Sequence, residues 1–359
     1  MKALIIEEQN KAVIKEVPVR ELEPDEILCR VTYCGICGTD LAIYTGETNF
    51  VRDGLIKYPV RIGHEWTGVV DRIGSAVTKF KPGDRVVSDN GVTCRKCPAC
   101  RRGDLAHCEN IKSVGTINCW DGGFAEYIIM PEIHLFHLPD NIDDRNAATI
   151  EPLTVSYAGI TKRKITPETI VAVIGTGPIA LGIVALAKTM GAGRIIAVGR
   201  TDSKLQRCLD AGATDIVNNT RVDAGEEVYR ITNGHGADFV LETSGATPTV
   251  QQAIDMAAEY GTLSMVGFYE TEINGLIFNR MVTKRLNIIG VMGEFGLVPK
   301  IIDYMEKTGL NLESMITREI PFSEAPDYFL HHKEMHKQDI KVLVKISCLG
   351  IFRALPEPA

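Results

Sequence analysis

The sequence has no stripe of basic residues, no low-complexity segment and no internal repeat. Its 46 aspartate and glutamate residues outnumber its 39 lysines and arginines, which gives a formal net charge of −7 at pH 7. A protein that binds nucleic acid mainly through the phosphate backbone needs a concentrated positive surface. The acidic balance therefore argues against nucleic acid as the main partner.

A signal or transit peptide is not recognisable in the first residues, MKALIIEEQNK, where a short apolar run is followed by acids. One uncharged stretch, residues 170–187, has 18 positions and approaches the length of a membrane span. Its Gly-Thr-Gly-Pro interruption favours a buried strand, a tight turn and a buried helix instead. We therefore expect a cytoplasmic protein with no membrane-spanning segment.

At 359 residues the chain exceeds the size of most single cores, so about two domains are expected. Residues 1–150 contain short β-type runs separated by glycine and proline turns, which indicate an irregular, mostly antiparallel β domain. From residue 169, strands and helices alternate, which predicts a doubly wound parallel α/β sheet. We predict strands at 170–174, 195–198, 215–217, 238–242 and 262–266, with helices at about 178–190, 203–211, 223–232 and 248–258. A helix at 297–308, a strand at 340–346 and a poorly ordered tail complete the prediction.

Ten cysteines without a secretory signal point to metal or thiol chemistry in a reducing compartment. The segment CRKCPACRRGDLAHC at 94–108 can close a tetrahedral zinc site of four thiolates, whose charge the neighbouring lysine and arginines offset. Such a site has no open position for a substrate, so we predict a structural role. Five other cysteines have no partner spacing and are expected to be small buried hydrophobes: Cys29, Cys34, Cys119, Cys208 and Cys348.

Candidate ligands for a catalytic metal lie elsewhere. GICGTD (35–40) offers Cys37, IGHEWTG (62–68) offers His64 and Glu65, and IEPL (150–153) offers Glu151. A catalytic zinc takes about three protein ligands and leaves one position for water or a substrate oxygen. Each piece alone is a weak signal.

A nucleotide-binding turn is predicted in VIGTGPIALG (173–182). Gly175 and Gly177 follow a strand and precede a helix, where glycine permits a tight turn and a close approach to a pyrophosphate. The third glycine of the pattern is replaced by Ala180, and Gly182 follows two residues later.

The turn after the second strand of this unit bears on the choice of coenzyme. It ends in Gly199 and Arg200, without the acidic residue that holds the ribose hydroxyls in NAD-specific sites. Gly199 leaves space for a 2′-phosphate, Arg200 can pair with it, and Lys204 could add a second cation. The pattern predicts NADP(H) over NAD(H), although Arg200 could also be an ordinary surface arginine in a solvated turn.

Taken in order, these motifs together with KPGDRVV (81–87) and DGGFAEY (121–127) resemble the zinc-dependent medium-chain alcohol dehydrogenase superfamily, from residue 1 to about 347. Trp66 after GHE, and EPL where liver-type alcohol dehydrogenases have a zinc-ligating cysteine, favour the sorbitol (polyol) dehydrogenase branch. The resemblance implies a GroES-like β catalytic domain at 1–153 with a zinc lobe at about 90–110, a Rossmann coenzyme domain at 154–291, and a return to the catalytic domain at 292–347 before the tail at 348–359.

The resemblance also implies residue roles. Cys37, His64 and Glu65 would hold the catalytic zinc, and Glu151 would either ligate it or hold its water. Asp40 would orient His64, and Thr39 would take the proton of the substrate hydroxyl. A second, structural zinc would be bound by Cys94, Cys97, Cys100 and Cys108, and the coenzyme would contact Gly175, Gly177, Pro178, Ile179, Gly182, Gly199, Arg200, Lys204, Ser244 and Gly267.

The implied activity is zinc-assisted hydride transfer between a nicotinamide coenzyme and a secondary alcohol, as a homo-oligomer (dimer or tetramer). A polyol, cyclitol or aminocyclitol is expected as substrate, with a 2-amino-3-hydroxy acid such as threonine as the alternative. A zinc-free quinone reductase of the same fold would lack the catalytic ligands, and a non-enzymatic NADPH-binding or structural zinc protein would be expected to lose Glu151 or Thr39. Ala42 departs from many relatives, which have a proton-relay histidine there; Tyr44 and Glu47 are near in sequence.

Overall fold

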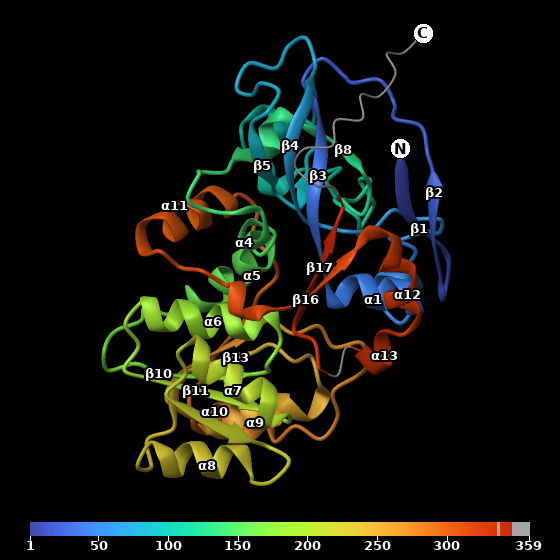
Figure 1. Ribbon diagram of the computed structural model, residues 1–359. Coiled ribbons are helices and arrows are strands. Elements are labelled where there is room, and N and C mark those ends of the chain that lie inside the picture. The colour runs from blue at the N-terminus through green and yellow to red at the C-terminus, as the bar shows by residue number, and fades with distance from the viewer. Residues whose placement is uncertain (336–337, 347–359) are drawn as a thin grey trace.

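The computed structural model describes residues 1–335 and 338–346, so the tail predicted at 348–359 and Cys348 lie outside the described residues. Two lobes are visible in Figure 1. The lower lobe, green to orange, is built on a parallel sheet, whereas the upper lobe, blue and red, is built on a mostly antiparallel one. Each lobe has its own buried apolar cluster.

The parallel sheet has the strand order β12-β11-β10-β13-β14-β15. The order reverses beside β10, which is the arrangement of a doubly wound fold. The predicted fold class is therefore confirmed. The strands are β10 (Ile170–Ile174), β11 (Arg194–Gly199), β12 (Asp215–Asn218), β13 (Ala237–Glu242), β14 (Ala257–Met265) and β15 (Asn287–Gly290), and the helices α6 (Pro178–Thr189), α7 (Asp202–Ala211), α8 (Ala224–Ile231), α9 (Thr247–Met256) and α10 (Phe278–Thr283).

Both faces of the sheet are buried at β10 and β11, which explains why these strands are nearly continuous apolar runs. Val171 and Val173 of β10 pack in one cluster with Leu181 of α6. Ala172 and Ile174, which point to the opposite face, pack in a second cluster with residues of α8 and α9. Residues 170–187 thus form β10, a turn and most of α6, and none of the described helices is long and apolar enough to cross a membrane.

The sequence prediction was wrong at the end of this lobe. The helix predicted at 248–258 ends at Met256, because β14 already begins at Ala257. Neither α10 nor β15 was predicted, since both are short and lie at the edge of the sheet with partly exposed apolar residues that show no clear period.

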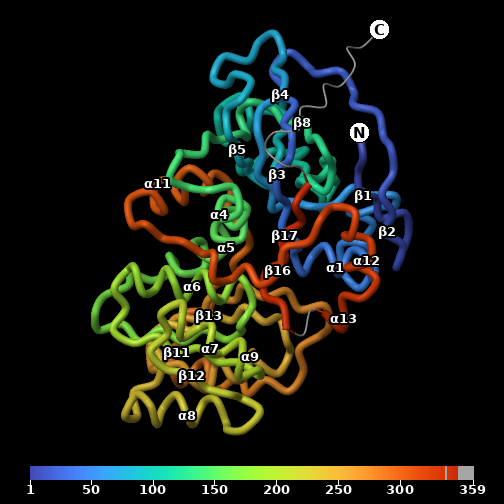
Figure 2. Tube along the Cα trace, viewed as in Figure 1, coloured from blue at the N-terminus to red at the C-terminus, as the bar shows by residue number. Residues whose placement is uncertain are grey.

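The upper lobe is organised around the long strand β3 (Glu26–Ile36), which pairs antiparallel with β4, β8 and β17. Figure 2 shows the C-terminal strand β17, in red, beside the blue β3. Strands β3 and β17, which are far apart in the sequence, are therefore neighbours in one sheet. The other strands are β1 (Lys2–Glu8), β2 (Lys11–Glu16), β4 (Glu65–Ile73), β5 (Arg85–Ser88), β6 (Gly91–Val92), β7 (Lys112–Ser113), β8 (Tyr127–Pro131), β9 (Leu135–His137), β16 (Ile316–Pro321) and β17 (Lys341–Lys345).

Several helices connect or flank the two sheets. The important one for the site is α5 (Ile150–Ile160), whose Leu153 packs in the same cluster as α6 of the lower lobe and Ile301 of α11. The others are α1 (Gly38–Thr45), α2 (Asn49–Arg52), α3 (Pro98–Arg101), α4 (Asp144–Ala147), α11 (Val298–Thr308), α12 (Ala325–Leu330) and α13 (His332–Met335). Of the unpartnered cysteines, Cys29, Cys34 and Cys208 are buried as expected, and Cys119 is half-buried.

Candidate active site

Cys37, His64 and Glu65 come together where β3 ends and β4 begins. The antiparallel register pairs Gly35 with Glu65, so the residue that caps α1 after β3, Cys37, lies beside the start of β4. One ligand atom from each of the three side chains lies within 4.8 Å of the others. Cys37 is half-buried, and His64 and Glu65 are buried.

Asp40 lies in the first turn of α1, close to both Cys37 and His64. One of its carboxylate oxygens accepts a hydrogen bond from the backbone N–H of Cys37 at 2.8 Å, which closes the N-terminus of the helix. The other, Oδ1, is 3.7 Å from Nδ1 of His64, and neither of these two atoms has a hydrogen-bond partner among the described residues. The distance is longer than a hydrogen bond, so the expected role of Asp40 in orienting His64 stays a prediction.

The charges of the site fit a bound cation. Burial alone would lower the pKa of His64, but the anionic groups of Asp40 and Cys37 outweigh it and raise that pKa well above its usual range. Burial raises the pKa of Asp40 and of Glu151, because no sufficient positive charge balances them. A thiolate, an imidazole and a carboxylate are a donor set that suits zinc. The residues present therefore fit a catalytic zinc.

Lys341, which the sequence reasoning did not identify, supplies part of the missing positive charge. Its ammonium group, from β17, forms a buried ion pair with Glu65 and donates to the carbonyl of Ile36 at 3.1 Å. Gly35 makes room for this arrangement, because a Cβ at that position would come within 2.2 Å of Oε2 of Glu65. The available signal was Lys341 in the mostly apolar strand IKVLVKI, at 340–346, which also contains Lys345.

Glu151 and Thr39 flank the group without belonging to it. Glu151, in the first turn of α5, is buried, and its Oε1 accepts a hydrogen bond from Nδ2 of Asn90 at 3.2 Å. It is not among the three side chains whose ligand atoms converge. Thr39 is half-buried in the first turn of α1, two residues after Cys37.

The four cysteines of the lobe also converge, with one sulfur from each within 4.8 Å of the others. Backbone N–H groups point at the sulfurs: Cys94 N–H donates to Cys108 Sγ at 3.2 Å, and Cys97 N–H to Cys94 Sγ at 3.4 Å. The N–H groups of Lys96 and Cys97 lower the pKa of Cys94 to about 6, against the effect of burial. Four sulfurs with such donors fit a tetrahedral structural zinc.

The glycine turn between β10 and α6 has the predicted geometry. Gly175 has a φ of +124°, and a Cβ there would lie 2.3 Å from Oγ1 of Thr243, so the position excludes a side chain. Gly177 is the N-cap of α6, and a Cβ there would meet nothing within 4 Å. Pro178 and Ile179 begin the helix, and Gly182 allows it to approach Ser156 of α5.

At the end of β11, two residues that were predicted to contact the coenzyme, Gly199 and Lys204, lie against other parts of the protein. A Cβ at Gly199 would lie 2.5 Å from Cγ2 of Thr176, so this glycine permits contact with the glycine turn. Lys204 donates to the carbonyl of Asp339 at 2.8 Å and thus faces the other lobe. Asp202 accepts from Nδ2 of Asn218 at 2.6 Å and pairs with Arg221, which the sequence reasoning missed. Arg200 is exposed beside them.

Ser244 and Gly267 lie at the carboxyl edge of the parallel sheet, around a buried carboxylate that was not predicted. Glu242 accepts hydrogen bonds from Ser244 N–H at 2.8 Å, from Thr249 Oγ1 at 2.8 Å, and from the hydroxyl of Tyr269. A Cβ at Gly267 would come within 2.6 Å of the same carboxylate. Glu242 therefore holds together the turns that form this edge.

The residues near Ala42 offer no obvious substitute for a relay histidine. Tyr44 is buried, and its hydroxyl donates to the carbonyl of Asn10 at 3.0 Å. Glu47 is exposed beyond the end of α1. Tyr44 therefore serves the core of the upper lobe.

Comparison with known proteins finds relatives that match this chain over nearly its whole length. The family model described as "Alcohol dehydrogenase GroES-like domain" matches residues 23–140, and "Zinc-binding dehydrogenase" matches residues 178–307. Sorbitol dehydrogenase of Bacillus subtilis is 31% identical over 344 residues, which cover 96% of this chain and 97% of that protein. D-xylulose reductase A of Aspergillus oryzae is 31% identical over 351 residues, 95% and 96% of the two chains. A solved zinc-binding dehydrogenase from Sinorhizobium meliloti 1021 bound to NADP matches with a TM-score of 0.85 and 30% identity, over 96% of this chain and 99% of that one.

The two cysteine-containing groups predict separable effects of substitution. Cys97→Ser should lower the thermal stability and remove one zinc, because a four-thiolate site contributes on the order of several kcal/mol to its local fold. His64→Ala should leave the four-cysteine group loaded but nearly abolish turnover. Metal analysis and thermal unfolding measure both, with Cys119→Ser as the control for a cysteine outside either group. A Cys97→Ser protein as heat-stable as wild type would contradict the assignment.

Proposed function

The chain belongs to the zinc-dependent medium-chain alcohol dehydrogenase superfamily, and we propose that it oxidises a polyol, cyclitol or aminocyclitol at a secondary hydroxyl, or reduces the corresponding ketone. The observation that carries the proposal is the convergence of Cys37, His64 and Glu65 in a protein that also has a doubly wound sheet with a glycine turn. Relatives named sorbitol dehydrogenase and D-xylulose reductase support a polyol as substrate.

The roles of the chain's own residues follow from the site. Zinc, when bound, would act as a Lewis acid on the alcohol oxygen, and the nicotinamide coenzyme would accept the hydride. Cys37, His64 and Glu65 would hold the metal. Glu151, whose Oε1 accepts a hydrogen bond from Asn90 at 3.2 Å, would orient the water or substrate oxygen at the fourth position of the metal. Thr39, half-buried beside Cys37, would take the hydroxyl proton.

Two further proposals concern assembly and location. The apolar side chains of Phe278, Val282 and Ile288 are 66%, 63% and 44% exposed, around the outer edge strand β15. An unpaired apolar edge is suited to pairing with a second copy of the chain, which supports a homo-oligomer.

A reducing compartment such as the cytoplasm would keep the cysteine ligands reduced, so that they could bind metal as thiolates.

The coenzyme we propose is NADP(H) in preference to NAD(H). Arg200 is exposed at the end of β11, and the carboxylate of Asp202, which would otherwise repel a phosphate, is engaged by Asn218 and Arg221. This arrangement supports a contact between Arg200 and a 2′-phosphate.

The substrate proposal is tested by a steady-state screen with both coenzymes across sorbitol, xylitol, a cyclitol, an aminocyclitol and threonine. We expect the highest kcat/KM within the polyol and cyclitol group, and loss of activity when a chelator removes the metal. A preference for threonine would favour a 2-amino-3-hydroxy acid dehydrogenase. Quinone reduction by a metal-free protein would overturn the proposal.

The coenzyme proposal predicts the effect of Arg200→Ala. This change should weaken NADPH binding by about 1.5–3 kcal/mol, the range for a hydrogen bond to a charged group, and leave NADH binding nearly unchanged. Fluorescence titration with each coenzyme measures the difference. Arg230→Ala, which removes an exposed arginine on α8, is the control and should alter neither. The proposal fails if wild type prefers NADH or if Arg200→Ala weakens both coenzymes equally.

The alanine at position 42 predicts how alcohol oxidation responds to pH. Without a relay histidine, alcohol oxidation should show little control by a group that titrates near about pH 6.5. Ala42→His should introduce such a dependence, visible in the pH profile of kcat. A wild-type profile that already follows one clear ionisation in this range would show that another group performs the relay.

A further inference from the structure

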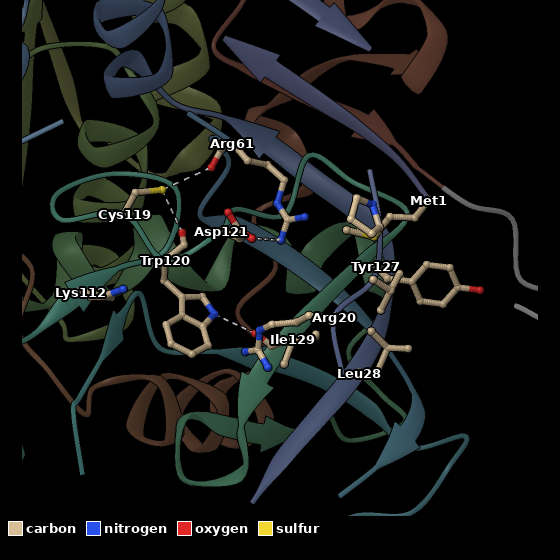
Figure 3. A pocket seen from close by; sticks show the side chains of 12 residues that line it. Met1, Arg20, Leu28, Arg61, Lys112, Cys119, Trp120, Asp121, Tyr127 and Ile129 are labelled. Carbon is tan, nitrogen blue, oxygen red and sulfur yellow. Dashed lines mark hydrogen bonds and ion pairs between the residues drawn. The ribbon is translucent and has the colours of Figure 1, made fainter. Parts of the chain in front are cut away.

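A cavity of about 330 Å³ lies in the upper lobe and includes none of the residues assigned to zinc or coenzyme. Arg61 and Asp121 meet inside it, and the indole of Trp120 forms one wall (Figure 3). The volume is at the lower end of the range for small-molecule sites, about 300–1,000 Å³. The cavity is therefore large enough for a compact organic molecule.

Arg61 is the unusual residue of this cavity. It is only 8% exposed, yet the one ion pair found for it among the described residues is a contact of 3.3 Å with Asp121, whose side chain is 71% exposed. Its Nε is buried and has no hydrogen-bond partner within the described chain. Burial lowers the pKa of Arg61, and Asp121 only partly opposes this effect. A buried guanidinium with so few partners is costly, which indicates a missing anionic partner.

The position of Arg61 is fixed by its own backbone. Its carbonyl accepts a hydrogen bond from the N–H of Gly122 at 2.9 Å and contacts Sγ of Cys119 at 3.6 Å. Its segment leads, three residues later, to His64. The guanidinium is therefore held at the cavity by a well-bonded main chain.

Other walls add positive charge and flat apolar surface. Trp120 is anchored by a hydrogen bond from Nε1 to the carbonyl of Ile129 at 2.7 Å, and Lys112 lies 5.9 Å from the centre of its ring. No ion pair is found for Lys112 within residues 1–335 and 338–346. Arg20 also lies over the ring, but Glu26 already neutralises it. Lys112 thus leaves a net positive charge beside the indole.

We propose that this cavity binds a small organic anion that carries a carboxylate or a phosphate ester. The anionic group would contact the guanidinium of Arg61 in place of the exposed Asp121, in the charge-assisted geometry that arginine favours. The body of the molecule would lie against Trp120 and the apolar side chains of Leu28 and Ile129. The site is separate from the zinc and coenzyme residues, so its test does not depend on the substrate proposed above.

The direct test is calorimetric titration of the full-length protein with benzoate, phenyl phosphate and the neutral analogue benzamide. We expect the two anions to bind with one site per chain and benzamide to bind at least tenfold more weakly, because it lacks the charge that pairs with Arg61. Whichever anion binds more tightly identifies the ligand class. Equal binding of benzamide, or no binding of either anion, would overturn the proposal.

Two substitutions should shift the affinity in opposite directions. Asp121→Asn removes the competing carboxylate at an exposed position and should tighten anion binding severalfold, whereas Arg61→Met should weaken it about tenfold or more. Lys300→Gln, at an exposed position outside the cavity, is the matched surface control and should leave the affinity unchanged. If Arg61→Met does not fold, Asp121→Asn alone decides. Unchanged binding in Asp121→Asn, or full binding in a folded Arg61→Met protein, would place the anion elsewhere and refute the site.

Discussion

The geometry of the candidate metal site depends on the buried ion pair between Lys341 and Glu65. The two side chains are 1% and 2% exposed, and a pair so removed from water is stable only when its other donors and acceptors are satisfied. Lys341 meets this condition by donating also to the carbonyl of Ile36. Because 276 residues separate the partners, the pair joins the C-terminal strand β17 to the ends of β3 and β4 where the ligands converge. Strand β17 is thus part of the candidate site.

A second set of contacts links this site to the coenzyme lobe. Glu242 holds Tyr269 at the carboxyl edge of the parallel sheet. The residues on either side of that tyrosine contact the upper lobe. Phe268 packs edge-to-face on Phe50 with ring centres 5.6 Å apart, and Glu270 pairs with Arg52 at 3.2 Å. Both upper-lobe partners belong to α2, which follows α1 and its cap. The loop at the carboxyl edge of the parallel sheet and helix α2 of the upper lobe are therefore in direct contact.

Local patterns were sufficient wherever the determining residues are close in sequence. The apolar runs of β10 and β11, the glycine turn and the four cysteines within 15 residues all predicted their structures, because each depends on neighbouring residues. The group of Cys37, His64 and Glu65 was expected only through the family resemblance, since no spacing rule places residue 37 beside residue 64. Lys341 was missed because its partner Glu65 lies 276 residues away in the sequence. Glu242 was missed because no sequence pattern marks a carboxylate that bonds to nearby turns, and β15 because it is a short edge strand with no clear period. The domain limits at 153 and 291 remain predictions.

The turn after β11 shows how such distant contacts change the meaning of a local charge pattern. In sequence, Arg200 and Lys204 form a cationic pair interrupted by Asp202. In the structure, Lys204 donates to the carbonyl of Asp339, which is 135 residues away in the sequence. Asp202 forms an ion pair with Arg221 from the loop after β12. Arg221 and Asp202 neutralise each other, so Arg200 is the positive group that remains for the proposed 2′-phosphate, and not two residues of one helical turn. Discrimination between the coenzymes would thus depend on Arg200 at the carboxyl end of β11, because the lysine that the local pattern offered as a second cation is bonded to Asp339 instead.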